Sequence, residues 1–204
     1  MEITVPKFDD LLFDEGTHVY MVSNSELPSV TTVMKPLSSD TYGGIDPVVL
    51  QKAADRGTTV HQAIEMYLLY GIVDIPPEFK PYLDAFMDFW NEYKPKVLSP
   101  EMKIYHKILR YAGTADLLCE INGEIVLIDY KTTSKINDML VGVQLEAYSK
   151  ALASWGVRAD KKAVLHLSKD GKYTLKWYEA NDSKRWSVFT SCLVVWQYIN
   201  DYRR

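Results

Sequence analysis

The chain has 204 residues, of which 47% are hydrophobic and 25% charged, and its formal net charge is −4. These values are typical of a single soluble globular domain and exclude an intrinsically disordered chain. A negative chain does not bind nucleic acid through a global positive field, which leaves only a local basic cleft for that purpose. There is no apolar run of about 18 residues and no secretion-signal pattern, so we expect a cytoplasmic protein without a membrane segment.

Cysteine usage excludes one class of cofactor. Only Cys119 and Cys192 are present, and two thiols cannot form a four-thiolate site. We therefore expect neither a disulfide framework nor an iron–sulfur cluster.

The N-terminal quarter predicts a hairpin followed by irregular structure. Residues 8–22 alternate in polarity around a central turn, which predicts a β-hairpin. Residues 27–36 predict a short helix or turn that ends at Pro36, and residues 38–46 predict a loop.

Two helices follow this segment. Residues 47–70 show helical spacing, with Asp46 as a plausible N-cap and Gly71 at the C-terminal end. A second helix is expected over residues 77–93, where aromatic side chains recur on one face.

The middle of the chain changes to strand patterns. Strands are expected at about 102–110, 115–121 and 124–132, and the Asn122-Gly123 dipeptide between the last two is a strong hairpin signal.

The last third returns to helix, hairpin and helix. Residues 137–156 have helical spacing, residues 161–180 predict a hairpin around Asp170-Gly171, and Asn181 or Asp182 is expected to cap a final helix. The order of elements predicts an α/β (α+β) domain with a central mixed sheet flanked by helices and an N-terminal β-hairpin. We expect one domain over 1–204, with the hairpin and loop in 1–45 and the core in 46–204.

Two carboxylates coincide on the central hairpin. A two-residue turn at Asn122-Gly123 pairs Ile121 with Glu124, and the same register sets Asp116 directly opposite Asp129. Their Cβ atoms would then lie roughly 4.5–5.5 Å apart. Two like charges at that distance repel unless a cation lies between them.

Lys131 shares the face of Asp129, because side chains two residues apart on a strand point the same way. An isolated D-x-K more often forms a buried salt-bridge cluster. Here the cluster keeps a net negative charge, and Gly113 removes side-chain bulk beside it, which suits approach of a substrate better than packing. The pattern therefore favours a divalent metal held by carboxylates, with a phosphoester as substrate.

Two helical pairs have side chains on a common face. His61 and Glu65 are spaced i, i+4, and so are Gln144 and Tyr148. On its own, each pair is more often a structural contact than part of a site.

Four motifs in order, "RGTTVH", "GTAD", "IDYK" and "QLEAY", resemble the PD-(D/E)XK nuclease superfamily. The resemblance is to its RecB-like exonuclease branch, including small stand-alone phage enzymes, and the opening "GTHVYMVSNSELPSVTTVM" is similar to the start of such phage-type proteins. This resemblance implies a restriction-endonuclease-like fold.

The resemblance also implies a Mg²⁺ or Mn²⁺ ion held by three side chains and one backbone carbonyl, those of His61, Asp116, Asp129 and Tyr130. Lys131 would be the catalytic lysine, and Gln144 and Tyr148 would support the site and touch the DNA strand. Glu65 would assist the metal, as a helical acid does in part of the superfamily.

The leading hypothesis is a metal-dependent DNA exonuclease in phage-type recombination, replication or repair. Basic candidates for the strand groove are Lys52, Arg56, Lys103, Lys107 and Arg110. The alternatives are a catalytically inactive nucleic-acid-binding or recombination accessory protein of the same fold, a structure-specific endonuclease, and a small-molecule phosphoesterase. A single-strand annealing or recombination protein and a homo-oligomer are expected as partners, together with a host-cell cytoplasmic location if the protein is phage-encoded.

Overall fold

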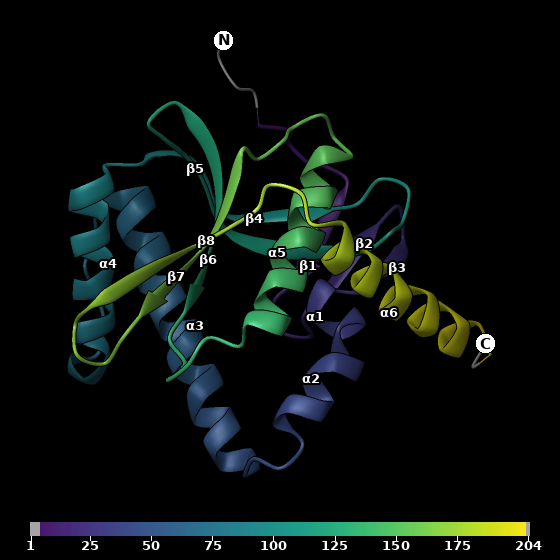
Figure 1. The fold of residues 1–204 in the computed structure, drawn as a ribbon, viewed down its shortest axis with the longest axis horizontal. Helices are drawn as coiled ribbons and strands as arrows, with labels where there is room; N and C mark the ends of the chain where they lie inside the picture. The colour runs from purple at the N-terminus through teal and green to yellow at the C-terminus, as the bar shows by residue number, and fades with distance from the viewer. Residues whose placement is uncertain (1–4, 203–204) are drawn as a thin grey trace.

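The computed structural model describes residues 5–202, apart from the side chains of residues 40 and 42. Its centre is a five-stranded sheet in the order β4-β5-β6-β7-β8 (Figure 1). The strands are β4 (Lys96–Tyr105), β5 (Ala112–Ile121), β6 (Glu124–Lys131), β7 (Lys161–Leu167) and β8 (Tyr173–Tyr178). Only β6 and β7 run parallel; the other neighbours in this sheet are antiparallel.

Helices cover both faces of this sheet (Figure 1). One face packs against α3 (Pro47–Tyr70) and α4 (Lys80–Tyr93), which is preceded by the 3₁₀ turn η1 (Pro77–Phe79). The other face packs against α1 (Val30–Val33), α5 (Asp138–Ala153) and α6 (Ser183–Tyr202). The sheet thus separates two hydrophobic cores, and the expected mixed sheet with flanking helices is confirmed.

The N-terminal hairpin is also confirmed. It forms from β1 (Leu11–Asp14) and β2 (Val19–Val22), and the structure adds β3 (Ser25–Leu27) to make a small antiparallel sheet of its own. This small sheet packs beside β4 through a third apolar cluster that includes Tyr20 and Tyr105.

Local signals located α3 and the central hairpin correctly. The Asp46 Oδ1 atom accepts a hydrogen bond from the Val48 N–H at 2.7 Å, and Gly71 ends α3 with φ of +68°. Asn122 and Gly123 both have positive φ, 53° and 82°, as a tight hairpin turn requires. Asp182 is the cap of α6, because its Oδ1 accepts the Arg185 N–H at 3.0 Å.

Two expected segments were wrong. Residues 38–46 are not all loop, because α2 spans Lys35–Tyr42; Pro36 begins this helix instead of ending one, since its missing N–H is not needed in a first turn. The first long strand runs over Lys96–Tyr105 and not over 102–110. Pro100 is tolerated in β4 because β4 lies at the edge of the sheet.

The described residues contain no helix long and apolar enough to cross a membrane. Residues 1–4 and 203–204, which the expected domain of 1–204 includes, lie outside the described range.

Candidate active site

The site forms where β5 and β6 separate. The predicted register is confirmed from Leu117–Ile128 to Ile121–Glu124, but this strand pairing ends one position before Asp116. Beyond that point the Asp116 Oδ2 atom accepts a hydrogen bond from the backbone N–H of Tyr130 at 2.6 Å. The Asp116 carboxylate therefore accepts the hydrogen bond that a backbone carbonyl of the neighbouring strand would otherwise accept. Beyond this point β5 and β6 are no longer paired, and a cavity lies between them.

This cavity has a volume of about 180 Å³ and receives side chains from the small N-terminal sheet, α3, β5, β6 and α5. Six of the predicted site residues line it: His61, Asp116, Asp129, Lys131, Gln144 and Tyr148. The order of motifs along the sequence thus becomes a single cluster in space.

A histidine and two carboxylates meet on one side of the cluster. His61 Nδ1 lies 3.5 Å from Asp116 Oδ1 and 3.6 Å from Glu101 Oε1, and the three ligand atoms are all within 4.8 Å of one another. α3 supplies the histidine, while β4 and β5 supply the acids.

Glu101 was not identified from the sequence. Pro100 pairs with Leu117 and Met102 pairs with Ala115, so Glu101 falls opposite Asp116. Its φ of +40° is unusual for a glutamate, and no hydrogen-bond partner reaches its buried Oε1 among the residues described. An acid in the strand before "GTAD" was the available signal, but the strand was expected to begin at residue 102.

The lysine lies on the other side of the cluster. Lys131 Nζ is 2.6 Å from Asp129 Oδ2 and donates to Gln144 Oε1 at 3.3 Å. Gln144 in turn donates through Nε2 to the Tyr148 hydroxyl at 3.2 Å. The i, i+4 pair on α5 therefore holds the lysine, and Lys131 is placed by both β6 and α5.

Gly113 has a packing role that the sequence did not indicate. A Cβ atom added there would lie 2.6 Å from Tyr148 Cε1. The missing side chain thus makes room for the ring of Tyr148, which is 5% exposed. Gly113 also lines the active-site cavity, so its expected role in substrate approach stays a prediction beside this packing role.

Other predicted residues lie at or beyond the edge of the cluster. Glu65 is not part of the His61, Glu101 and Asp116 group, although its charge acts on Glu101. The Tyr130 side chain is 1% exposed and packs in the core against His61 and Phe86, so only its backbone faces the site.

The basic candidates differ in what they contact. Lys103, Lys107 and Arg110 lie over the rings of Phe13, Trp155 and Tyr105, respectively. Arg56 and Lys52 instead line a second and larger cavity.

Burial and neighbouring charges move the pKa values of the cluster apart. Burial lowers the pKa of His61, but the Asp116 and Glu101 carboxylates outweigh it and raise that pKa to about 10. Burial raises the pKa of Asp129 to about 6 against the opposing effect of Lys131, and it also raises the pKa of Glu101. Against the effect of its own burial, contacts with His61 and Lys131 keep the pKa of Asp116 below its usual range.

The donor set suits a hard divalent cation. A Mg²⁺ ion bound at 2.0–2.1 Å holds its ligand atoms no more than about 4.2 Å apart, and the His61 distances to Asp116 and Glu101 are within that limit. Glu101 Oε1 and Asp129 Oδ1 are buried without a hydrogen-bond partner among the described residues, as expected of oxygens kept for a ligand.

Comparison with known proteins found remote structural similarity. LHK-Exo in complex with dAMP is 16% identical, over 87% of this chain and 89% of that one, with a TM-score of 0.43. A second structure of LHK-Exo, an alkaline exonuclease from Laribacter hongkongensis, is 17% identical over 70% and 82%, with a TM-score of 0.36. The protein SSO0001 is 14% identical over 69% and 73%, with a TM-score of 0.37. No protein-family model matches the sequence, and no curated protein does.

Proposed function

We propose that this chain is a divalent-metal-dependent DNA nuclease that acts as an exonuclease. The observation that supports this most directly is the meeting of His61 and Asp116 with the Asp129–Lys131 ion pair around one cavity, with Glu101 grouped beside His61 and Asp116. Acidic ligands beside a positioned lysine are the components that hydrolysis of a phosphodiester requires.

The metal would be held by the ligands that the sequence implied, namely His61, Asp116, Asp129 and the Tyr130 carbonyl. Glu101 would be an additional ligand. When bound, Mg²⁺ or Mn²⁺ would polarise a phosphoryl oxygen and make a bound water more acidic.

Lys131 would act on the phosphate. Its ammonium group is fixed at 2.6 Å from Asp129 and 3.3 Å from Gln144 Oε1. A cation held in this way stabilises negative charge as it develops on the reacting phosphate without having to reorganise. Gln144 keeps the lysine in place, and Tyr148 keeps the amide of Gln144 oriented.

The finer parts of the proposal rest on the sequence motifs. We propose that the nuclease acts at DNA ends or on single strands and that it takes part in phage-type recombination, replication or repair. We also propose that it is a cytoplasmic protein of one domain. An annealing or recombination partner and a homo-oligomer belong to the same proposal, as do DNA contacts by Arg56, Lys103, Lys107 and Arg110.

The test compares Asp129→Ala and Lys131→Ala with Glu124→Ala, an exposed acid on the same strand that pairs with Lys161. Linear DNA, closed circular DNA and free nucleotides are incubated with Mg²⁺ or Mn²⁺. We expect nucleotide release from linear DNA only, a loss of about 100-fold or more in the first two variants, and unchanged activity in the third.

Three other outcomes would change or refute this proposal. Cleavage of circular DNA would replace exonuclease by endonuclease. Full activity in Asp129→Ala would refute the mechanism, and absence of Mn²⁺ binding by calorimetry would favour an inactive nucleic-acid-binding protein.

A further inference from the structure

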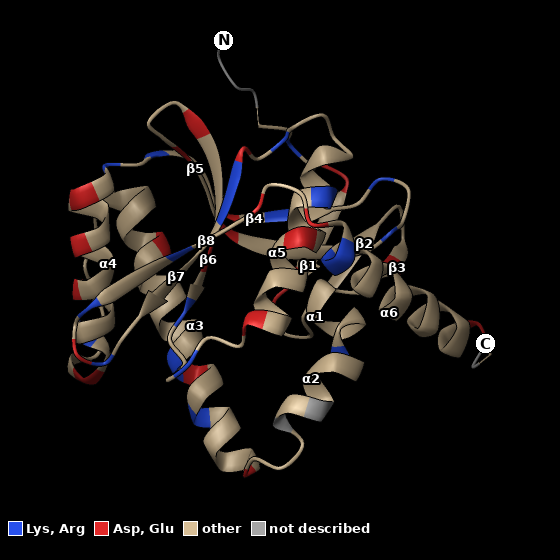
Figure 2. Cartoon of the chain, viewed as in Figure 1, with Lys and Arg blue, Asp and Glu red and all other residues tan. Residues whose placement is uncertain are grey.

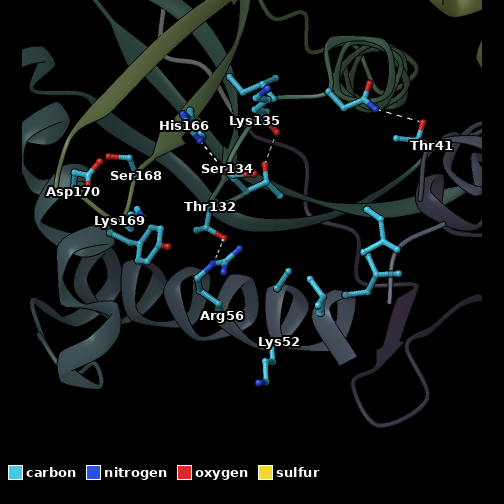
Figure 3. Close-up of a pocket in the computed structure, with 18 of the residues that line it drawn as sticks. Thr41, Lys52, Arg56, Thr132, Ser134, Lys135, His166, Ser168, Lys169 and Asp170 are labelled. Atoms are coloured by element: carbon cyan, nitrogen blue, oxygen red, sulfur yellow. Dashed lines mark hydrogen bonds between the residues drawn. The ribbon is translucent and has the colours of Figure 1, made fainter. Parts of the chain in front are cut away.

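A second cavity, larger than the one at the candidate active site, begins one residue beyond Lys131 along the chain. It has a volume of about 980 Å³ and lies between the N-terminal half of α3, the segment 132–138 that follows β6, and the turn between β7 and β8 (Figure 3). Thr132 lines this cavity, and Lys131 lines the active-site cavity. The two cavities thus meet the chain at neighbouring residues, at the end of β6.

Four cations border the larger cavity: Lys52, Arg56, Lys135 and Lys169. Arg56 points from α3 toward the segment after β6, where its Nε donates to Thr132 Oγ1 at 3.4 Å (Figure 3). Two acids also line it, Asp138 and Asp170, so that the four cations outnumber them, and the charge of Asp138 is further offset by Lys176 at 2.5 Å and Arg185 at 3.1 Å. Acidic residues recur elsewhere, for example along α4 (Figure 2). The cavity is thus locally basic in a chain of net charge −4.

The remaining wall is apolar and open to solvent. Ile45, Val49 and Leu50 line the cavity with 41%, 57% and 37% of their surface exposed. Large apolar side chains gathered in a concave site indicate a ligand that covers them. A DNA duplex shows mainly phosphates on its outside, whereas an unpaired strand also exposes the faces of its bases.

We propose that this cavity binds an unpaired polynucleotide strand, with its phosphates on Arg56, Lys135 and Lys169 and its bases on the apolar wall. The strand runs from the cavity past Thr132 to the phosphate at Lys131. This inference rests on the proposed nuclease function, and it makes a single strand the form of substrate that enters the site.

The test measures binding in EDTA, where the metal-dependent reaction does not run. The probe is a fluorescein-labelled oligothymidylate of about 12 nucleotides, followed by anisotropy, with a blunt duplex of equal length for comparison. We expect Val49→Asp to weaken binding of the single strand about tenfold through loss of contact with the bases. Lys135→Gln should lower the slope of log K against log salt by about 0.7, the value for one lost phosphate contact on a single strand.

Two control variants carry the same changes in charge outside the cavity. Val48→Asp alters the neighbouring residue of α3, which is 61% exposed and does not line the cavity, and Lys96→Gln alters an exposed lysine of β4. Both should leave binding of the single strand within about twofold of wild type.

Equal effects of Val49→Asp and Val48→Asp would overturn the inference and leave the cavity for a different occupant, such as a protein segment. Equally tight binding of the blunt duplex would also overturn it. Binding that depends on Val49 without any cleavage in Mn²⁺ would refute the nuclease proposal alone. Cleavage together with binding that is independent of Val49 would refute the cavity assignment alone.

Discussion

One buried ion pair fastens the helix that carries Gln144 and Tyr148 to the sheet. Lys162 on β7 contacts Glu146 on α5, and their side chains are 1% and 0% exposed. The same carboxylate accepts the backbone N–H of Asp182, the cap of α6, at 3.1 Å. Glu146 therefore joins three elements in the interior.

Replacing Lys162 by Met should be strongly destabilising, because the buried Glu146 carboxylate loses its buried cation and keeps only the partly exposed Lys150, 3.5 Å from its other oxygen. Loss of one partner from a buried pair costs about 3–5 kcal/mol in the free energy of unfolding. For a chain of this length that corresponds to a fall in Tm of about 6–20 °C. Urea unfolding followed by circular dichroism measures the first quantity, and thermal unfolding measures the second.

A second substitution should recover most of the loss. Glu146→Gln removes the charge but keeps an oxygen for the Asp182 N–H, so Lys162→Met with Glu146→Gln should be clearly more stable than Lys162→Met alone. The matched control is Lys161→Met, whose lysine is 47% exposed and 2.6 Å from the exposed Glu124; it should cost no more than about 1 kcal/mol. A cost for Lys162→Met no greater than that for Lys161→Met would refute the role of the buried pair, and so would a double variant as unstable as Lys162→Met alone.

Three further outcomes are expected at the site. Gly113→Ala should displace the Tyr148 ring and lower the rate of DNA cleavage while Mn²⁺ affinity in calorimetry stays near wild type, because its Cβ would lie 2.6 Å from that ring; an unchanged rate would contradict it. Glu101→Gln should weaken Mn²⁺ binding, whereas equal affinity would remove Glu101 from the ligand set. The raised pKa of His61, about 10, means that metal must displace a proton at neutral pH. Mn²⁺ affinity should therefore rise by about tenfold per pH unit between about pH 7 and 8.5, and calorimetry showing the same affinity across that range would refute it.

The same proton also gives the metal-free protein a stability that depends on pH. The pKa of His61 is higher in the folded state than its ordinary value of 6.5, so the folded protein holds this proton more tightly than the unfolded chain. The contribution is complete below about pH 6.5 and is lost as the pH rises through about 10.

Features fixed by neighbouring residues could be predicted from the sequence. Asp46, Pro47 and Gly71 define the ends of α3 through capping and backbone conformation, and Asn122-Gly123 sets the register of the central hairpin. The grouping of Asp116 with the other motif residues follows from that register and from the family resemblance.

Features that depend on tertiary contacts could not be predicted in this way. Glu101 reaches the site because β4 pairs along the edge of the sheet with a register shift between Val97 and Ser99, and no local pattern indicates that shift. Tyr148 fills the space over Gly113 only because α5 packs against β5, so the glycine alone could not show what lay beside it. The sequence motifs identified most of the site residues, whereas the contacts of Glu101 and Tyr148 depend on how β4 and α5 pack against β5.

The charge balance of the cluster explains why the fold tolerates so many acids in its interior. Glu101, Asp116 and Asp129 contribute three negative charges, while the His61 imidazolium and the Lys131 ammonium contribute two positive ones. One negative charge in excess is costly in a partly closed site, and this cost accords with the raised pKa values of the buried Glu101 and Asp129 carboxyl groups. Exchanging the His61 proton for a divalent cation brings the same five side chains to neutrality. The groups that make the metal-free cluster unfavourable are therefore the groups that would make it select a doubly charged ion.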